Sequence, residues 1–213
     1  MVHYKLSYFN ARGYAEATRI MFHMAGVEFE DERYELEDWL KPELSGKDKM
    51  PFGQMPVLEV DGVQIPQSFA IARFIGRRFG FAGKTDVEQA WVDAFGDLYK
   101  DFLAEMKPWA MIAFGYPGGT GDREELKKTA LLPAQAKYFG ILKKYLKKSK
   151  SGFIVDSGIT WADLFFYETT LTMKNIEEGY LSDEYPEIIA YFHAIENHPL
   201  VKPYFVTRVV TPK

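Results

Sequence analysis

The sequence predicts an α+β domain with a mixed sheet, followed by an all-α helical bundle. Its 213 residues can form one large domain or two small ones. As far as Gly83, short β-like runs alternate with helical patterns, whereas only helical patterns follow from Asp86. The order strand–helix–strand, a long loop, then strand–strand–helix is typical of a mixed sheet with helices packed on it.

The elements of the first part are separated by recognisable breaks. Gly13 interrupts the first strand, and Gly26 can terminate the first helix. Asp61-Gly62 is a strong signal for a two-residue β-hairpin. In order, we expect a strand at residues 5–9, a helix with Ala17, Ile20, Met21 and Met24 on one face, a strand at residues 29–34, a hairpin of residues 57–60 and 63–65, and a helix that includes Ile71, Phe74 and Ile75.

The second part contains four amphipathic patterns of helical period. Residues 80–85, which include two glycines in the run FGFAGKT, are the expected linker between domains at residues 1–79 and 86–213. Pro133 stands near the start of one helix, where a missing N–H costs least. The expected buried faces are Trp91, Phe95, Leu98 and Phe102; Leu132, Phe139, Leu142 and Leu146; Trp161, Leu164 and Phe165; and Ile188, Phe192 and Ile195.

Composition excludes several classes of protein. With 47% hydrophobic and 26% charged residues, the chain is globular rather than disordered. No stretch approaches the roughly 18 apolar residues of a membrane helix, and the first ten residues do not resemble a signal peptide. The formal charge of −4 does not favour a nucleic-acid binder. The absence of cysteine excludes disulfides, zinc-thiolate sites and cysteine nucleophiles, so we expect a cytoplasmic protein.

Three further patterns indicate structure rather than chemistry. The glycines at residues 115–121 lack the lysine and the preceding strand of a phosphate-binding loop. His193 and His198 are five residues apart, which does not place two metal ligands on one helical face, so we expect no metal site. Thr160 with Asp163 is typical of a helix N-cap.

Three places are harder to explain as structure alone. Tyr8 closes the first strand, at the end where functional groups of α/β sheets gather, although its spacing alone favours a packed strand aromatic. Met55-Pro56 precedes a strand and can carry a cis peptide bond. Ser68 stands between the hairpin and a helix, where it is a simple N-cap or, with the free N–H groups there, part of a carboxylate site.

These places, in this order, resemble the cytosolic glutathione S-transferases, and most closely the sigma class with its invertebrate enzymes and haematopoietic prostaglandin D synthases. The resemblance covers essentially the whole chain, and it lies in the joint order and spacing of the motifs. They are residues 8–16 (YFNARGYAE), 38–39 (DW), 51–62 (PFGQMPVLEVDG), 67–73 (QSFAIAR), 92–93, 97, 101, 108–109 (PW) and 159–163 (ITWAD).

The resemblance implies a thioredoxin-like N-terminal domain, glutathione as cosubstrate without a metal, and a cytoplasmic homodimer that acts in detoxification. Tyr8 matches the catalytic tyrosine, which would donate a hydrogen bond to the glutathione thiolate as a neutral hydroxyl. Implied glutathione contacts are Trp39, Lys47 (or Lys49), Gln54, Met55, Pro56, Gln67, Ser68 and, from the partner subunit, Asp101. Candidates for the wall that binds the hydrophobic electrophile are Phe9, Tyr14, Leu103 and Trp109.

Two departures weaken the expectation of prostaglandin D synthase activity. Tyr14 stands where the vertebrate synthases have an arginine, and Lys100 replaces one acid of their acidic cluster. Alternatives to conjugation are a glutathione-dependent prostaglandin isomerase, a carrier of haem or other amphipathic ligands, and a structural module that reuses the fold. Tyr8 together with Gln67 and Ser68 favours the transferase, because a scaffold needs no hydroxyl that faces a sulfur atom.

Overall fold

The computed structural model describes residues 2–41, 43 and 46–211, so the outermost residues of the two expected domains lie outside it. In chain order its elements are β1 (Tyr4–Phe9), the 3-10 turn η1 (Gly13–Ala15), α1 (Glu16–Met24), β2 (Glu30–Tyr34), α2 (Leu36–Trp39), the 3-10 turn η2 (Lys47–Lys49), β3 (Val57–Val60), β4 (Val63–Pro66), α3 (Ser68–Phe79), α4 (Asp86–Ala113), α5 (Arg123–Leu126), the π-helical turn η3 (Lys127–Leu131), α6 (Leu132–Leu146), α7 (Trp161–Ile176), α8 (Pro186–Glu196) and α9 (Lys202–Thr207).

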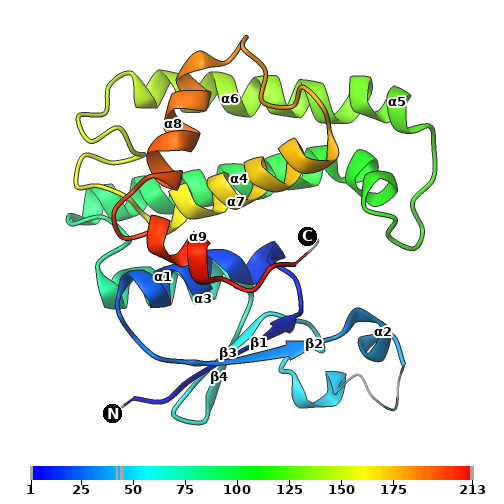
Figure 1. Ribbon diagram of the computed structural model, residues 1–213, viewed down its shortest axis with the longest axis vertical. Coiled ribbons are helices and arrows are strands. Elements are labelled where there is room, and N and C mark those ends of the chain that lie inside the picture. Colours follow the sequence, from blue (N-terminus) through cyan, green and yellow to red (C-terminus); the bar gives the residue numbers. More distant parts are fainter. Residues whose placement is uncertain (1, 42, 44–45, 212–213) are drawn as a thin grey trace.

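The N-terminal part is a four-stranded mixed sheet with the strand order β2-β1-β3-β4. β1 pairs parallel to β2 and antiparallel to β3, and β3 pairs antiparallel to β4 across the predicted Asp61-Gly62 turn. Helices α1 and α3 lie between the sheet and the long helices α4 and α7 (Figure 1). The predicted strand–helix order and the thioredoxin-like fold class are therefore confirmed.

The two parts of the chain share one hydrophobic core, in which Trp161 at the start of α7 is fully buried. A Cβ atom on Gly96 of α4 would lie 2.1 Å from the Trp161 ring, so only glycine lets α4 approach this closely. The Trp161 N–H also donates to the Phe81 carbonyl at 2.9 Å. The expected linker, residues 80–85, is thus anchored to the helical part rather than loose.

Two predicted apolar faces are corrected by the structure. The buried face of α4 runs through Val92, Phe95, Tyr99, Phe102, Met106 and Trp109. Trp91 is 43% exposed and lies on the ring of Tyr145 with a centroid distance of 4.9 Å, at the edge of the bundle. Leu132 of α6 is also exposed. Large apolar residues at a helix edge satisfy the 3.6-residue period as well as buried ones do, so period alone does not separate them.

The predicted cap of α7 is confirmed as a capping box. The Asp163 carboxylate accepts from the Thr160 N–H at 2.7 Å and from the Ile154 N–H at 3.0 Å. It also accepts from the Tyr191 hydroxyl. Burial raises the pKa of Asp163, and these hydrogen bonds act in the opposite direction.

Candidate functional site

A cleft of about 310 Å³ lies where the N-terminal end of α3, the loop before β3 and the middle of α4 meet. Its wall combines apolar and polar side chains with an exposed helix N-terminus, the composition of a typical small-molecule site. The lining residues are Tyr14, Phe52, Gln54, Met55, Pro56, Pro66, Gln67, Ser68, Phe69, Lys100 and Leu103.

Tyr8, near the carboxyl end of β1, is not one of the residues that line this cleft, but it is hydrogen-bonded to the backbone of Tyr14, which does line it. Its side chain is only 6% exposed, and its hydroxyl oxygen accepts a hydrogen bond from the Tyr14 N–H at 3.2 Å. Burial raises the pKa of Tyr8 to about 12, because the phenolate is penalised in a desolvated place. The hydroxyl therefore keeps its proton at neutral pH and can donate it in a hydrogen bond to an anion.

Gly13 is what allows the backbone to fold over the Tyr8 hydroxyl. Its φ is +40°, and a Cβ atom there would lie 2.6 Å from the hydroxyl oxygen. Both the backbone conformation and the space require glycine. The turn after β1 is thus shaped around the Tyr8 hydroxyl as well as around the chain reversal.

Gln67 and Ser68 form the start of α3 at the opposite side of the cleft. Gln67 has a φ of +75°, which few residues other than glycine adopt, and such conformations concentrate at functional sites. Its carbonyl accepts from the Ile71 N–H at 2.9 Å. The first N–H groups of α3 beside the Ser68 side chain suit a carboxylate.

The loop before β3 completes this side of the cleft. The peptide bond between Met55 and Pro56 is cis, as predicted, and both residues line the cleft. Gln54 lines it too. Trp39 is buried with Met50 and Val57 in a small cluster against which Met55 packs, so it supports the loop from behind.

Of the two candidate lysines, Lys47 is the one that faces Trp39. Its Nζ lies 5.5 Å from the centroid of the Trp39 ring. Neither Lys47 nor Lys49 lines the cleft itself.

The expected electrophile wall is only partly present in the cleft. Tyr14 and Leu103 line it, and Phe9 packs between Tyr8 and Trp39 instead. Trp109 lies on the buried face of α4 and is fully buried in the core, so its side chain does not line the cleft. The Pro108-Trp109 motif identifies the position of this tryptophan in the sequence but does not predict where its ring points. The ring points into the core because Trp109 lies on the buried face of α4.

Sequence reasoning missed several lining residues. Phe69 stacks on Phe165 at 4.7 Å between ring centroids, and the Lys100 Nζ lies 5.7 Å from the Phe69 ring. Phe69 lies within the QSFAIAR motif, and Lys100 was singled out only as a departure from the acidic cluster, so neither was expected to line the site.

Asp101 does not line this cleft. It is exposed on α4, beside Leu98, Glu105 and Lys137. Its neighbour one turn earlier, Asp97, is paired with Arg73 of the same chain at 2.8 Å.

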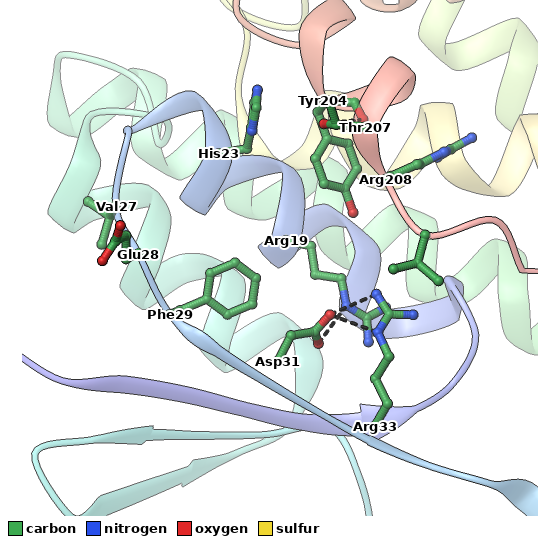
Figure 2. Close-up of a pocket in the computed structure, with 11 residues that line it drawn as sticks. Arg19, His23, Val27, Glu28, Phe29, Asp31, Arg33, Tyr204, Thr207 and Arg208 are labelled. Atoms are coloured by element: carbon green, nitrogen blue, oxygen red, sulfur yellow. Dashed lines mark hydrogen bonds and ion pairs between the residues drawn. The ribbon is translucent and has the colours of Figure 1, made fainter.

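A larger cavity of about 490 Å³ lies elsewhere, between α1, β2 and α9 (Figure 2). Its guanidinium groups are already paired: Asp31 accepts from Arg19 at 3.0 Å and from Arg33 at 2.8 Å. The smaller cleft, by contrast, is lined by Tyr14, whose N–H is bonded to the neutral Tyr8 hydroxyl. Among the residues described, no cluster of His, Asp or Glu could hold a metal ion, and no helix is long and apolar enough to cross a membrane.

Comparisons with known proteins agree with this geometry. Residues 4–77 match the model of the glutathione S-transferase N-terminal domain, and residues 105–208 match that of the glutathione S-transferase C-terminal domain. The chain is 42% identical over 214 residues to "Glutathione S-transferase 1" of Ascaris suum, covering all of both chains.

Three solved structures are also similar. A monomeric glutathione S-transferase of Necator americanus, Na-GST-3, is 44% identical with a TM-score of 0.91 and covers 99% of this chain and 100% of that one. A Nu-class enzyme of Haemonchus contortus is 43% identical with a TM-score of 0.86 and 99% coverage of both. Prostaglandin synthase D of Nilaparvata lugens is 32% identical with a TM-score of 0.83, over 98% of this chain and 100% of that one. By the domain models and these full-length relatives, the chain belongs to the glutathione S-transferase family.

Proposed function

We propose that the chain conjugates glutathione to hydrophobic electrophiles with Tyr8 as the residue that stabilises the thiolate. The observation that carries the proposal is the Tyr8 hydroxyl, which is protonated, buried and already paired as an acceptor with the Tyr14 N–H. Its own hydrogen is therefore available for a sulfur atom in the cleft. A thiol with an ordinary pKa of about 8.5 is only a few per cent ionised at neutral pH, so stabilisation of the anion raises the reactive fraction.

Glutathione fits the residues around the cleft. The γ-glutamyl carboxylate would bind at Ser68 and the first N–H groups of α3, with Gln67 beside it. The cysteinyl backbone would pair with Met55 in the loop that includes Gln54 and Pro56. Lys47 beside Trp39 would meet the glycyl end, and the position of Lys47 against the indole ring favours it over Lys49.

The electrophile would occupy the part of the cleft near Tyr14 and Leu103, with Phe69 as an additional apolar surface. Lys100 adds a cation at this rim, which would favour electrophiles with an acidic group. This arrangement supports a role in detoxification but does not favour a carrier function without turnover, because a carrier needs no neutral hydroxyl directed at a sulfur atom.

A dimer with a shared site is part of the proposal. Phe52, in the loop before Pro56, is 62% exposed, so a partner subunit could cover it. Asp101 is exposed and lies outside its own cleft, as a residue given to the partner's glutathione would. The Necator americanus relative is described as monomeric, so the oligomeric state must be measured in solution.

The glutathione S-transferase class, prostaglandin isomerisation and the cellular location are further parts of the proposal. Sigma-class membership is a prediction from motifs, and the name of the Haemonchus contortus neighbour favours the Nu class instead. Prostaglandin isomerisation finds some support in the name of the Nilaparvata lugens protein, whereas Tyr14 and Lys100 still argue against it. A cytoplasmic location is favoured by the absence of cysteine.

The direct test is capture on immobilised glutathione, followed by conjugation of a chromogenic aryl halide. We expect both capture and turnover. Ser68→Ala should weaken capture, whereas Ser182→Ala, in the loop between α7 and α8, should not. Capture without turnover would replace the transferase by a glutathione-binding carrier.

A further inference from the structure

A chain of buried ion pairs joins the C-terminal segment to the turn that follows β1. Arg208, the residue after α9, places its Nη1 atom 2.9 Å from Glu168 Oε1 and 3.4 Å from Glu16 Oε1. On their other oxygens, Glu168 pairs with Arg12 at 3.3 Å and Glu16 pairs with Arg19 at 3.1 Å. The side chains of Glu16 and Glu168 are 2% and 5% exposed, so these charges depend on one another rather than on water.

The same groups fix the backbone of the turn. Arg19 donates to the Ala11 carbonyl at 2.7 Å. The Arg12 carbonyl accepts from the Glu16 N–H at 3.1 Å. This turn carries the Tyr14 N–H that binds the Tyr8 hydroxyl, so the position of that hydroxyl depends on where Arg12 and Arg19 are held.

The C-terminal segment contacts this network at a second point. Figure 2 shows Tyr204 of α9 directed toward Arg19 of α1. Its hydroxyl donates to Glu16 Oε1 at 2.9 Å. Residues almost 200 positions away in the sequence therefore hold one of the two carboxylates beside the turn.

The two carboxylates need Arg208 because they repel each other. Burial, and next the charge of Glu16, raise the pKa of Glu168 to about 7, while Arg208 and Arg12 act against the rise. Without Arg208, Glu168 would hold a proton over more of the neutral range. Its hydrogen bond to Arg12 would then lose the strength that an ionised acceptor provides.

We propose that Arg208 is a positioning residue for catalysis: it holds Glu16 and Glu168 together, so that Arg12 and Arg19 fix the turn that places the Tyr8 hydroxyl. Arg208 itself does not touch the reacting atoms. The inference rests on the proposed role of Tyr8.

The test is Arg208→Gln, with the thiolate absorbance of bound glutathione followed against pH. We expect the pKa of the bound thiol to rise by roughly half to one unit, and conjugation at pH ~6.5 to fall about three- to tenfold. The KM for glutathione should stay within about twofold. Arg208→Lys keeps the charge and should give a smaller shift in the same direction, which can be measured even if the glutamine variant does not fold.

Arg123→Gln is the matched control, because Arg123 pairs with the buried Glu177 at 3.0 Å, outside the turn. It should leave the thiol titration unchanged. In a Glu168→Gln background, the effect of Arg208→Gln should shrink, since the contact through which it acts is already weakened.

Two outcomes overturn the inference. One is a lower melting temperature with conjugation reduced equally at every pH, which describes a purely structural role. The other is an unchanged thiol titration in both Arg208 variants while Tyr8→Phe shifts it. If Tyr8→Phe shifts nothing, the proposed role of Tyr8 fails first, and the inference fails with it.

Discussion

Replacing Tyr8 by phenylalanine removes one hydroxyl and leaves the ring in place. The ring packs at 5.2 Å against Phe9, and phenylalanine preserves this contact. A hydrogen bond to an ionised group contributes about 1.5–3 kcal/mol, which corresponds to about one to two units of pKa at roughly 1.36 kcal/mol per unit. We therefore expect the bound thiol of the variant to titrate about one to two units higher than in the parent.

The expected loss depends on pH in a defined way. If the parent holds the thiol near pKa ~7, about a quarter is thiolate at pH ~6.5, compared with about 1% for an unassisted thiol near pKa ~8.5. The rate at pH ~6.5 should then fall about twentyfold. Above pH ~9.5 both thiols are ionised, so the difference in thiolate fraction disappears and the two enzymes should differ little. Tyr8 itself stays protonated throughout, since its pKa is raised to about 12.

The assay is the pH profile of aryl-halide conjugation, together with the thiolate absorbance of the binary complex. Tyr4→Phe is the matched control: it makes the same change on the same strand, where Tyr4 is buried against Phe22 at 5.2 Å. It should reproduce the parent profile. An unchanged profile for Tyr8→Phe would show that another group stabilises the thiolate.

Three further changes test other parts of the structure. Gly13→Ala should lower turnover at least about tenfold with a smaller change in the KM for glutathione, because its Cβ atom would meet the Tyr8 hydroxyl at 2.6 Å. Parent-like kinetics would contradict this expectation. Asp163→Ala should lower the free energy of unfolding by about 2–4 kcal/mol in urea titrations, because the buried N–H groups of Thr160 and Ile154 lose their acceptor. A loss under about 1 kcal/mol would show that this cap contributes little to stability. Asp101→Asn should raise the KM for glutathione but not that for the electrophile, and a fully active monomer in sedimentation would exclude the shared site.

Local patterns predicted the strands, the hairpin and the longer helices but not the short helices α2, α5 and α9. Alternation and the 3.6-residue period act within a few residues, and they need several turns to be recognised. The capping box of Thr160 and Asp163 was predictable for the same reason. The start of α3 was predictable only in part: Ser68 is a typical N-cap residue, but nothing in the sequence indicates the φ of +75° at Gln67. That conformation is imposed by the surrounding fold, and local propensity points against it.

The site residues that escaped prediction depend on contacts between distant segments. Whether Trp109 faces the cleft or the core depends on which face of α4 meets α6 and α7, and its sequence neighbours do not determine this. Arg12 and Glu168 are 156 residues apart, and their pairing has no local signal. From the sequence alone, a charged residue in a short motif is interpreted as a solvated surface group, and only the fold shows that it is buried.

The buried charges of the turn also explain why it is not apolar. Arg12, Glu16 and Arg19 lie within eight residues and are all buried, an arrangement that hydrophobic residues of similar volume could often match in stability. Hydrophobic side chains, however, cannot donate hydrogen bonds to the carbonyls of Phe9 and Ala11, as Arg19 does. A turn that must hold a backbone N–H against one hydroxyl oxygen needs such directional contacts. We infer that the charges are kept for position, and stability is the smaller part of what they contribute.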